Sequence, residues 1–472
     1  MKVQTREAGQ ARPDAAEAIA DHLVRTNYDA LSPRVVAAAK AGILDTIACA
    51  LAGTGNAEIA AVGALVEDWA GKPLCTLIGR GGQKASPEQA TLLNAAMVHQ
   101  YDFDDVHDIA PCHPSSTSVL PALAVAEAKG GIDGRRFLTA VALGNDLTSR
   151  VSLAIHGNVH DYPWFRAPVV GIFGATAAAA VILGANREQT LNAFGLALPA
   201  VGGTWASLQH PGSNVRSLRD GLSYRNAVLA VALAMRGICG ERDVFEGPYG
   251  LFHAFFGGNY DRERFIGSLG RIYETERVSL KPWPSIRHLH TTLTAVLDVM
   301  VKHDLRFEDV KNVHLHVGRT NRNRCNPVAP GAIPALRMDL LGNLVFAVGN
   351  AIRHRNVPLK VYRDPVMADD VIVNAMPRVS WEYDPAMDGE LTFERGLIDL
   401  TTTKGYVLHG ACTVARGHPD NPMNEAERHA KLRLCAAAAA KPPTEARICE
   451  IIAAIDDLEN MQDVSALATL LA

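Results

Sequence analysis

The chain has 472 residues, of which 48% are hydrophobic and 20% are charged, and 46 Lys and Arg residues against 50 Asp and Glu residues give a formal net charge of -4. This composition is typical of a globular protein with room for two or three domains. The near balance of charge argues against nucleic acid as the main partner, because binding phosphates requires a concentrated surplus of basic residues.

The eight cysteines are spread along the whole chain without a CxxC pair. We therefore expect reduced and mostly buried thiols, and neither a disulfide framework nor a zinc site. The first 14 residues are polar and lack the apolar core of a secretory signal, so we expect a cytoplasmic protein.

One stretch, residues 169–185, is apolar enough to resemble a membrane span. Ala and Gly dominate it, and it barely reaches the length needed to cross a bilayer. Small residues on every face suit a helix packed closely against other helices. We expect a buried core helix and no membrane association.

The first half of the chain is predicted to be helical. Ser32-Pro33 and Ser86-Pro87 are each typical of a helix start, with an N-cap residue followed by proline at the first helical position. Apolar residues at helical spacing predict helices over residues 15–25, 35–51, 57–70, 118–129, 134–155, 187–198 and 221–235.

After about Arg271 the pattern changes. Alternating or β-branched runs predict strands over residues 276–280, 310–317, 378–383, 391–399 and 406–408, with helices over 286–302 and 336–352. The tail returns to helix over residues 424–439, 444–458 and 464–471. We therefore predict a mainly α protein with an α+β domain: a large all-helical domain formed by residues 1–270 and 415–472, and a smaller inserted α+β domain over 271–414.

The densest polar segment runs from His99 to His113 and holds four carboxylates and three imidazoles. Apolar residues are interleaved with these polar groups, and the segment runs into two prolines. This pattern is typical of a scaffold that presents acid/base groups at a cleft. A metal site would use His99, Asp102, His107 and His113, but their spacing matches no known pattern, so we expect no metal. The plain alternative is an Asp-rich helix end whose histidines bond backbone groups.

Two cationic segments follow. Arg216 and Arg219 lie near a predicted helix start, where backbone N–H groups also favour an anion, although a solvated basic patch fits the same pattern. Lys281 precedes a rigid Pro-Trp-Pro corner and is either an anion ligand or a surface lysine. Ser285 is then expected to cap a helix that carries His290.

Common cofactor motifs are absent from the sequence: there is no GxGxxG after a strand, no Walker loop and no GxSxG elbow. The glycines at Gly79, Gly81 and Gly82 are better explained as a turn before the next helix. This favours an enzyme that works with side chains alone, without a cofactor.

Three strings can be compared with a known family: YDFDD…HPSS over residues 101–116, PVVGIFGATAAAA over 168–180, and KPWPSIRHLH over 281–290. In order and spacing they resemble the MmgE/PrpD family, which includes 2-methylcitrate dehydratase, cis-aconitate decarboxylase and iminodisuccinate epimerase. The resemblance extends from about Asp14 to the end of the chain.

The resemblance implies a large all-helical domain with a smaller α+β lid domain inserted into it, and a site in the cleft between them. It also implies a homodimer, no metal or organic cofactor, and small di- or tricarboxylates as substrates. A mildly acidic protein would need a locally cationic pocket for such substrates.

The resemblance also implies roles for individual residues. Asp102 stands at the position of the family's active-site aspartate, His113 at that of the histidine in its HPS motif, and Lys281 at that of its cleft lysine. His290 matches a second histidine of the lysine segment and is expected to bind substrate.

Other positions depart from the family's decarboxylase pattern. Val106 replaces a small hydroxyl residue, and Phe165, with Arg166 beside it, replaces a histidine. Arg216 replaces a lysine, and Arg219 replaces a second histidine. Groups that move protons are lost and arginines, which stay protonated and bind anions, are gained.

These residues lead to one mechanistic hypothesis: proton abstraction at a carbon next to a carboxylate. Lys281, Arg216 and Arg166, assisted by Arg219, would bind the carboxylates, and His113, oriented or charged by Asp102, would move the proton. Dehydration ranks first because it is the family's commonest assignment. Epimerisation or decarboxylation of a carboxylate, and a family member that binds a carboxylate without converting it, are the alternatives.

Overall fold

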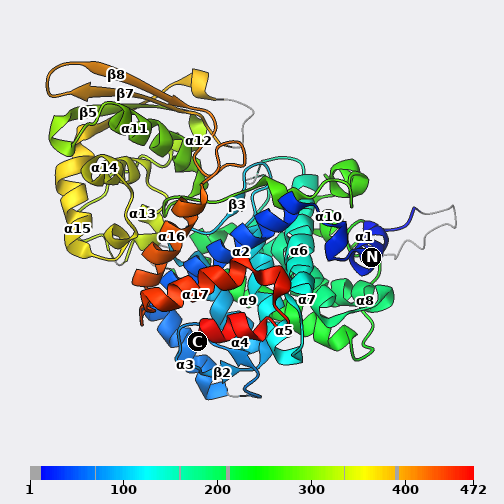
Figure 1. Ribbon diagram of the computed structural model, residues 1–472. Coiled ribbons are helices and arrows are strands. Elements are labelled where there is room, and N and C mark those ends of the chain that lie inside the picture. Colours follow the sequence, from blue (N-terminus) through cyan, green and yellow to red (C-terminus); the bar gives the residue numbers. More distant parts are fainter. Residues whose placement is uncertain (1–11, 70, 159–160, 209–212, 334, 389–392) are drawn as a thin grey trace.

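The computed structural model describes residues 12–69, 71–158, 161–208, 213–333, 335–388 and 393–472, and it has two lobes (Figure 1). The amino-terminal segment from which a cytoplasmic location is expected lies largely outside these residues, as does the start of the strand expected at 391–399. Most of the described chain is helical, with small sheets, which confirms a mainly α protein with an α+β portion.

Helices build the larger lobe. They are α1 (Ala15–Arg25), α2 (Pro33–Gly53), α3 (Ala57–Trp69), α4 (Pro87–Val98), α5 (Pro114–Lys129), α6 (Gly134–Ala154), α7 (Arg166–Leu183), α8 (Arg187–Ala197), α9 (Val215–Ala234) and α10 (Leu251–Phe256). Ser32 caps α2 by accepting a hydrogen bond from the Val35 N–H (3.2 Å), as the Ser-Pro pattern predicts. A short strand pair, β1 (Cys75–Thr76) and β2 (Lys84–Ala85), precedes α4.

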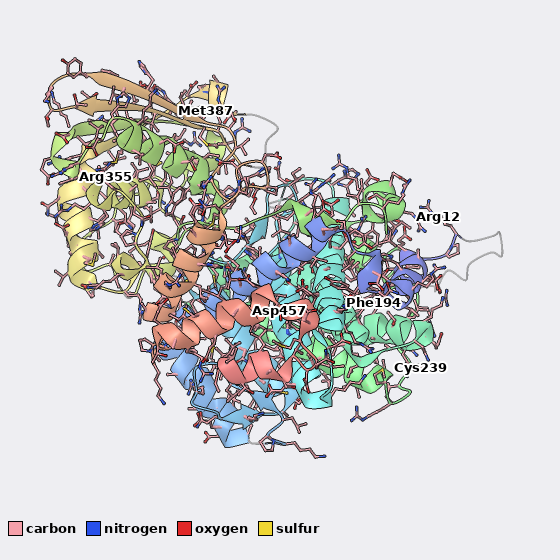
Figure 2. All side chains as sticks on the ribbon, in the orientation of Figure 1. Arg12, Phe194, Cys239, Arg355, Met387 and Asp457 are labelled. Atoms are coloured by element: carbon pink, nitrogen blue, oxygen red, sulfur yellow. The ribbon has the colours of Figure 1, made fainter. Side chains whose placement is uncertain are left out.

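Helix α7 lies in the core of the large lobe, between α5, α6 and α9. A Cβ on Gly174 would lie 2.6 Å from the carbonyl oxygen of Gly144 in α6, so only glycine allows the two helices to approach this closely. Phe194 of α8, labelled in Figure 2, belongs to an aromatic cluster with Phe173 and Phe245. The buried core helix expected at residues 169–185 is confirmed.

Two helices, α2 and α7, are long and apolar enough to cross a membrane by length and composition. Their most apolar windows are 78% and 89% buried inside the protein, respectively. Packing in the core therefore accounts for their apolar character. All eight cysteines are free thiols and six of them are buried, as the sequence predicts.

The smaller lobe combines a sheet with helices. Its elements are α11 (His290–Lys302), β5 (Val310–Val317), α12 (Arg319–Arg322), α13 (Arg337–Leu340), α14 (Leu344–His354), α15 (Pro365–Asp370), β6 (Val379–Tyr383), β7 (Gly396–Thr402) and β8 (Val407–Cys412). The strand order is β6-β5-β7-β8, with β5 and β6 parallel and the other neighbours antiparallel. Helix α11 packs against β7 and β8 (Figure 1).

The connection between the lobes includes a second strand pair, in which β3 (Val106–His107) is antiparallel to β4 (Val278–Ser279). The chain then enters the small lobe and returns through α16 (Glu425–Ala437), α17 (Glu445–Asp456) and α18 (Ser465–Leu470). Helices α16 and α17 pack against α2, and α18 packs against α5 (Figure 1). The boundaries expected after residues 270 and 414 stay predictions.

Some expected boundaries are wrong. Helix α5 begins at Pro114 instead of residue 118, and α9 begins at Val215 instead of residue 221. Ser285 does not cap a helix: a 3-10 turn follows, and α11 begins only at His290. The Ser285 hydroxyl instead lies 3.0 Å from the His290 imidazole Nε2. Strands β7 and β8 form an antiparallel hairpin, with Gly405 at φ 87 in its turn.

A buried lysine anchors the returning helix α16. Lys431 Nζ donates to Asp45 Oδ1 (2.5 Å), to the Phe103 carbonyl oxygen (2.7 Å) and to the Lys281 carbonyl oxygen (2.9 Å). All three ammonium protons are thus used. Because Phe103 and Lys281 belong to two of the three strings on which the resemblance rests, α16 supports both of those segments.

We expect Lys431→Met to lower the free energy of unfolding by about 3–5 kcal/mol, because the Asp45 carboxylate would stay buried without its partner. Chemical denaturation followed by circular dichroism measures the change. The matched control is Lys441→Met, since Lys441 is exposed. Equal stability of the two variants would contradict the structural role of Lys431.

Candidate active site

The first element of the site is Asp102, at the end of the 3-10 turn His99–Tyr101 that follows α4. Asp102 adopts a left-handed backbone conformation (φ 47, ψ 40), which aspartate tolerates better than most residues. The conformation ends the turn and redirects the chain. The side chain of Asp102 is buried.

Two cations from distant parts of the chain meet the Asp102 carboxylate. Lys281 Nζ donates to Asp102 Oδ1 (2.6 Å) and to its carbonyl oxygen (2.8 Å). Arg216, from the first turn of α9, donates to Asp102 Oδ2. Burial alone would raise the pKa of Asp102, but the charges of Lys281 and Arg216 hold this pKa well below its usual value. Asp102 is therefore an anion in a cationic setting.

His113 is anchored through one ring nitrogen. Its Nδ1 lies 2.7 Å from the Asp105 carbonyl oxygen and 3.0 Å from Asp104 Oδ2. Both groups accept hydrogen bonds, so Nδ1 carries a proton and Nε2 remains for other chemistry. Burial opposes the charged imidazole, yet the Asp104 carboxylate outweighs burial, and the pKa of His113 is raised above 6.5.

This arrangement corrects one sequence-based expectation. Asp102 was expected to orient or charge His113, but Asp104 is the carboxylate that contacts the ring. Asp102 is paired with Lys281 and Arg216 and only adds to the raised pKa of His113. The alternation of aspartates in the string does not reveal which carboxylate faces the imidazole, because the left-handed turn at Asp102 rotates the chain between them.

Asp104 also holds a second imidazole. Its Oδ1 lies 3.0 Å from His99 Nδ1, and the His99 and His113 rings meet edge to face at 4.7 Å. Burial outweighs the nearby carboxylates and lowers the pKa of His99, which favours its neutral form. By distance, His99, Asp104 and His113 are able to ligate a metal ion. However, the carbonyl acceptor beside His113 Nδ1 requires a proton on that nitrogen, so a hydrogen-bonded network fits these residues better.

Asp102, His113 and Lys281 line one cavity of about 1230 Å³ between the two lobes. The large lobe contributes α7 and α9 residues, and the small lobe contributes residues that flank its sheet: Arg319, Thr320, Arg324, Asp388, Phe393 and Glu394. Among the described residues, seven cationic side chains line it: Arg166, Arg216, Arg264, Lys281, Arg287, Arg319 and Arg324. In the same part of the chain, three carboxylates oppose them: Asp102, Asp388 and Glu394. The surplus of positive charge suits an anionic ligand.

The structure brings Arg166 and Arg216 to the cavity wall, but not Arg219 or His290. The Arg219 guanidinium lies behind the wall, 4.0 Å from the centre of the Phe165 ring and within 3.3 Å of His99 Nε2. His290 is fully buried, and burial together with Arg287 lowers its pKa well below the usual value. A neutral, buried imidazole is unsuited to binding a carboxylate by charge.

Apolar side chains replace the proton-moving groups of the decarboxylase pattern. Val106 and Phe165 line the cavity, and the Trp205 ring meets Phe165 edge to face at 4.6 Å. This part of the wall is therefore apolar, and the Arg219 guanidinium lies behind its aromatic ring. Neither Val106 nor Phe165 can act as an acid or a base.

Sequence reasoning missed the contribution of the small lobe. Arg319 and Arg324 lie in and after the short helix α12, and both line the cavity. Burial and the nearby Arg216 guanidinium lower the pKa of Arg324 to about 10. The sequence feature that could have identified these two residues is the arginine-rich segment 319–324. The spacing of its arginines, however, does not indicate that the segment faces Asp102.

Fold and cavity together define a two-lobed, mainly helical protein whose lobes enclose a cavity lined by arginines and a lysine. The model of the MmgE/PrpD N-terminal domain matches residues 17–263, and that of the MmgE/PrpD C-terminal domain matches residues 283–457. The chain belongs to the MmgE/PrpD family.

Among curated relatives, the chain is 26% identical to the cis-aconitate decarboxylase-like protein oryM of Aspergillus oryzae over 459 residues, which is 93% of each chain. It is also 26% identical to the cis-aconitate decarboxylase of Aspergillus terreus over 314 residues, which is 63% of each chain.

We expect Asp104→Asn to lower the pKa of His113, because the carboxylate that chiefly opposes the effect of burial would be removed. In the native protein, this interaction contributes stability that is fully present below about pH 6.5 and is lost as the pH rises through the raised pKa. Titration of the His113 ring Cε1–H signal by NMR measures the shift, with His113→Gln assigning the signal.

The control for this titration is Asp108→Asn, which removes a carboxylate that pairs with Arg287 instead of His113. It is expected to leave the His113 midpoint unchanged. A midpoint that is the same in Asp104→Asn and the native protein would contradict the assignment.

Proposed function

We propose that the protein is a lyase that acts on a small di- or tricarboxylate with side chains alone, and that His113 donates a proton at a carbon next to a carboxylate. One observation carries the proposal: an imidazole with a raised pKa and an anchored Nδ1 borders a cavity rich in Arg and Lys. General acid catalysis needs a positioned proton donor of this kind.

The cationic side chains would bind the substrate and stabilise the charge that develops. Arg166 comes from the start of α7, Arg216 from the start of α9, and Lys281 from the connection between the lobes. Cations fixed in a cavity that excludes much of the solvent stabilise a developing carbanion more strongly than cations in water do. Because they are held in place before the reaction, they need little reorganisation during it.

Decarboxylation makes the most direct use of this site. The bond between a carbon and its carboxylate breaks, CO2 leaves, and the electron pair stays on the carbon, where an adjacent unsaturated carboxylate delocalises it. His113 Nε2–H then donates its proton to carbon and becomes neutral, and solvent restores that proton. The names of the relatives, cis-aconitate decarboxylases, support the same reaction.

Dehydration of a 2-methylcitrate-like hydroxy acid is the second candidate, favoured by the family's commonest assignment. Protonated His113 would release the hydroxyl group as water, but a second, neutral group must first remove a proton from carbon. An imidazole with a raised pKa fits the donor's role better than the acceptor's. For this reason we place decarboxylation first.

A substrate panel tests the proposal. The protein is incubated with cis-aconitate, 2-methylcitrate, citrate and iminodisuccinate, while CO2 release, alkene absorbance and optical rotation are followed. We expect CO2 release or a change in alkene absorbance with at least one tri- or dicarboxylate. A change in optical rotation alone would identify an epimerase, and binding without any turnover would identify a carboxylate-binding protein; either result would contradict the proposal.

We expect His113→Gln to reduce turnover by about 10²–10⁴-fold, because it removes the proton donor but no cation. Ligand-induced thermal stabilisation should persist, since the cationic residues of the cavity remain. His303→Gln is the matched control, because His303 is exposed at the end of α11. Turnover in His113→Gln equal to that of the control would contradict the role of His113.

We also propose that the protein is a homodimer, as the resemblance to the family implies. Leu222 and Leu229, seven residues apart on one face of α9, are 50% and 48% exposed, and Trp69 of α3 is 53% exposed. Light scattering after size-exclusion chromatography is expected to give twice the chain mass of 50.6 kDa. Leu229→Glu is expected to shift the mass toward that of one chain, and a native mass of 50.6 kDa would contradict the dimer.

A further inference from the structure

A cluster of histidines and carboxylates lies on the sheet of the small lobe, outside the cavity. In β5, Val313, Leu315 and Val317 are buried, so the alternate residues His314 and His316 occupy the opposite face of the strand. Helix α11 packs against β7 and β8, beneath the outer edge of the sheet in Figure 1.

We propose that His314, His316 and Glu382 form a binding site for a divalent transition metal ion of the zinc type. One ligand atom from each of the three residues lies within 4.8 Å of those of the other two. Glu382 Oε1 lies against His314 Nε2 and His316 Nδ1. Imidazole nitrogen and carboxylate oxygen are ligands that Zn²⁺ uses in proteins. None of these three residues lines the cavity, so the site is distinct from the candidate active site.

The distances fit a metal of this size. Glu382 Oε1 lies 3.1 Å from His316 Nδ1 and 3.7 Å from His314 Nε2. Zinc bonds of about 2.0–2.2 Å in a tetrahedron place ligand atoms about 3.3–3.6 Å apart. Adjustments of a few tenths of an ångström bring these two pairs into that range, and the imidazole nitrogens lie within 4.8 Å of each other. The fourth corner would face solvent, because the Glu382 side chain is 57% exposed.

A second set of residues orients both imidazoles. His314 Nδ1 lies 2.9 Å from the Ser380 hydroxyl oxygen, and Ser380 in turn donates to Asn312 Oδ1 (3.3 Å). His316 Nε2 lies 3.2 Å from Asp399 Oδ2. Metal-binding histidines generally donate their other ring N–H to such a partner, which fixes the ring and its tautomer.

This orientation directs a nitrogen lone pair of each imidazole toward the Glu382 carboxylate. With protons on His314 Nδ1 and His316 Nε2, the opposite nitrogens of both neutral rings face the Glu382 carboxylate. Two lone pairs and an anionic oxygen repel one another unless a cation lies between them. A positive charge between these three atoms removes the repulsion, and a metal ion bound to all three would supply that charge.

The site would join two strands that lead to the active-site cavity. The ligands come from β5 and from β6, the edge strand that pairs with it in parallel register. Beyond the ends of these strands lie Arg319 and Asp388, which line the cavity, and the Arg319 backbone N–H donates to Asp388 Oδ1 (2.6 Å). A metal would therefore fix the sheet edge next to the cavity without taking part in the chemistry.

The test uses the full chain, freed of metal with a chelator and then titrated with Zn²⁺ in a calorimeter and with Co²⁺ in a visible spectrometer. We expect His314→Gln/His316→Gln to remove one Zn²⁺ equivalent per chain and the intense visible bands of tetrahedral Co²⁺. Ser380→Ala should keep this site but weaken it by about 10–100-fold. Mg²⁺ should not compete, because it prefers six oxygen ligands.

The control is His429→Gln, since Glu425, His429 and Asp456 form another group with ligand-like distances. This variant is expected to keep the equivalent that the double variant loses. Circular dichroism and the thermal midpoint of the metal-free proteins establish that each variant is folded; if the double variant is unfolded, Ser380→Ala alone decides through the weakening of binding. Absence of Zn²⁺ binding in the native protein, or an equivalent and affinity unchanged in the variants, would overturn the proposal.

Discussion

The site depends on a buried carboxylate held between two cations from distant parts of the chain. Asp102 follows α4, Arg216 begins α9, and Lys281 precedes the small lobe, and no stretch of local sequence brings them together. Burying three charges is costly, and the pairs offset this cost only while all partners are in place. The ion-paired cluster is therefore a positional constraint: it fixes the segment that connects the two lobes against the ends of α4 and α9, at the wall of the cavity.

Two aspartates separated by one residue have different tasks. Asp102 balances the cations, so that Lys281 and Arg216 stay fixed at the cavity wall. Asp104 charges His113, with its second oxygen on His99. The two carboxyl groups are chemically identical, and their different neighbours give them different roles. Enzymes use the same principle when two acidic residues have different partners.

Much of the fold could be predicted because its signals are local. Apolar spacing and a capping residue define α1, whose observed bounds match the expected ones, and β-branched alternation defines β5 in the same way. The motifs also identified Asp102, His113 and Lys281, which the structure brings to one cavity. The direction of a side chain, however, depends on tertiary packing and cannot be predicted from the local sequence. His290 contacts Ser285, and Arg219 lies against the face of the Phe165 ring. Arg324 was missed because only the docking of the small lobe gives it a place in the cavity.

The most direct measurement of the central claim is a crystal structure with an unreactive tricarboxylate such as propane-1,2,3-tricarboxylate. The account predicts carboxylate groups bound by Arg216 and Arg166 at the cavity wall beside Lys281, with a ligand carbon about 3–3.5 Å from His113 Nε2, the separation of a reactive complex. A ligand held elsewhere on the protein, or one in the cavity whose carbons all lie beyond the reach of His113, would contradict it.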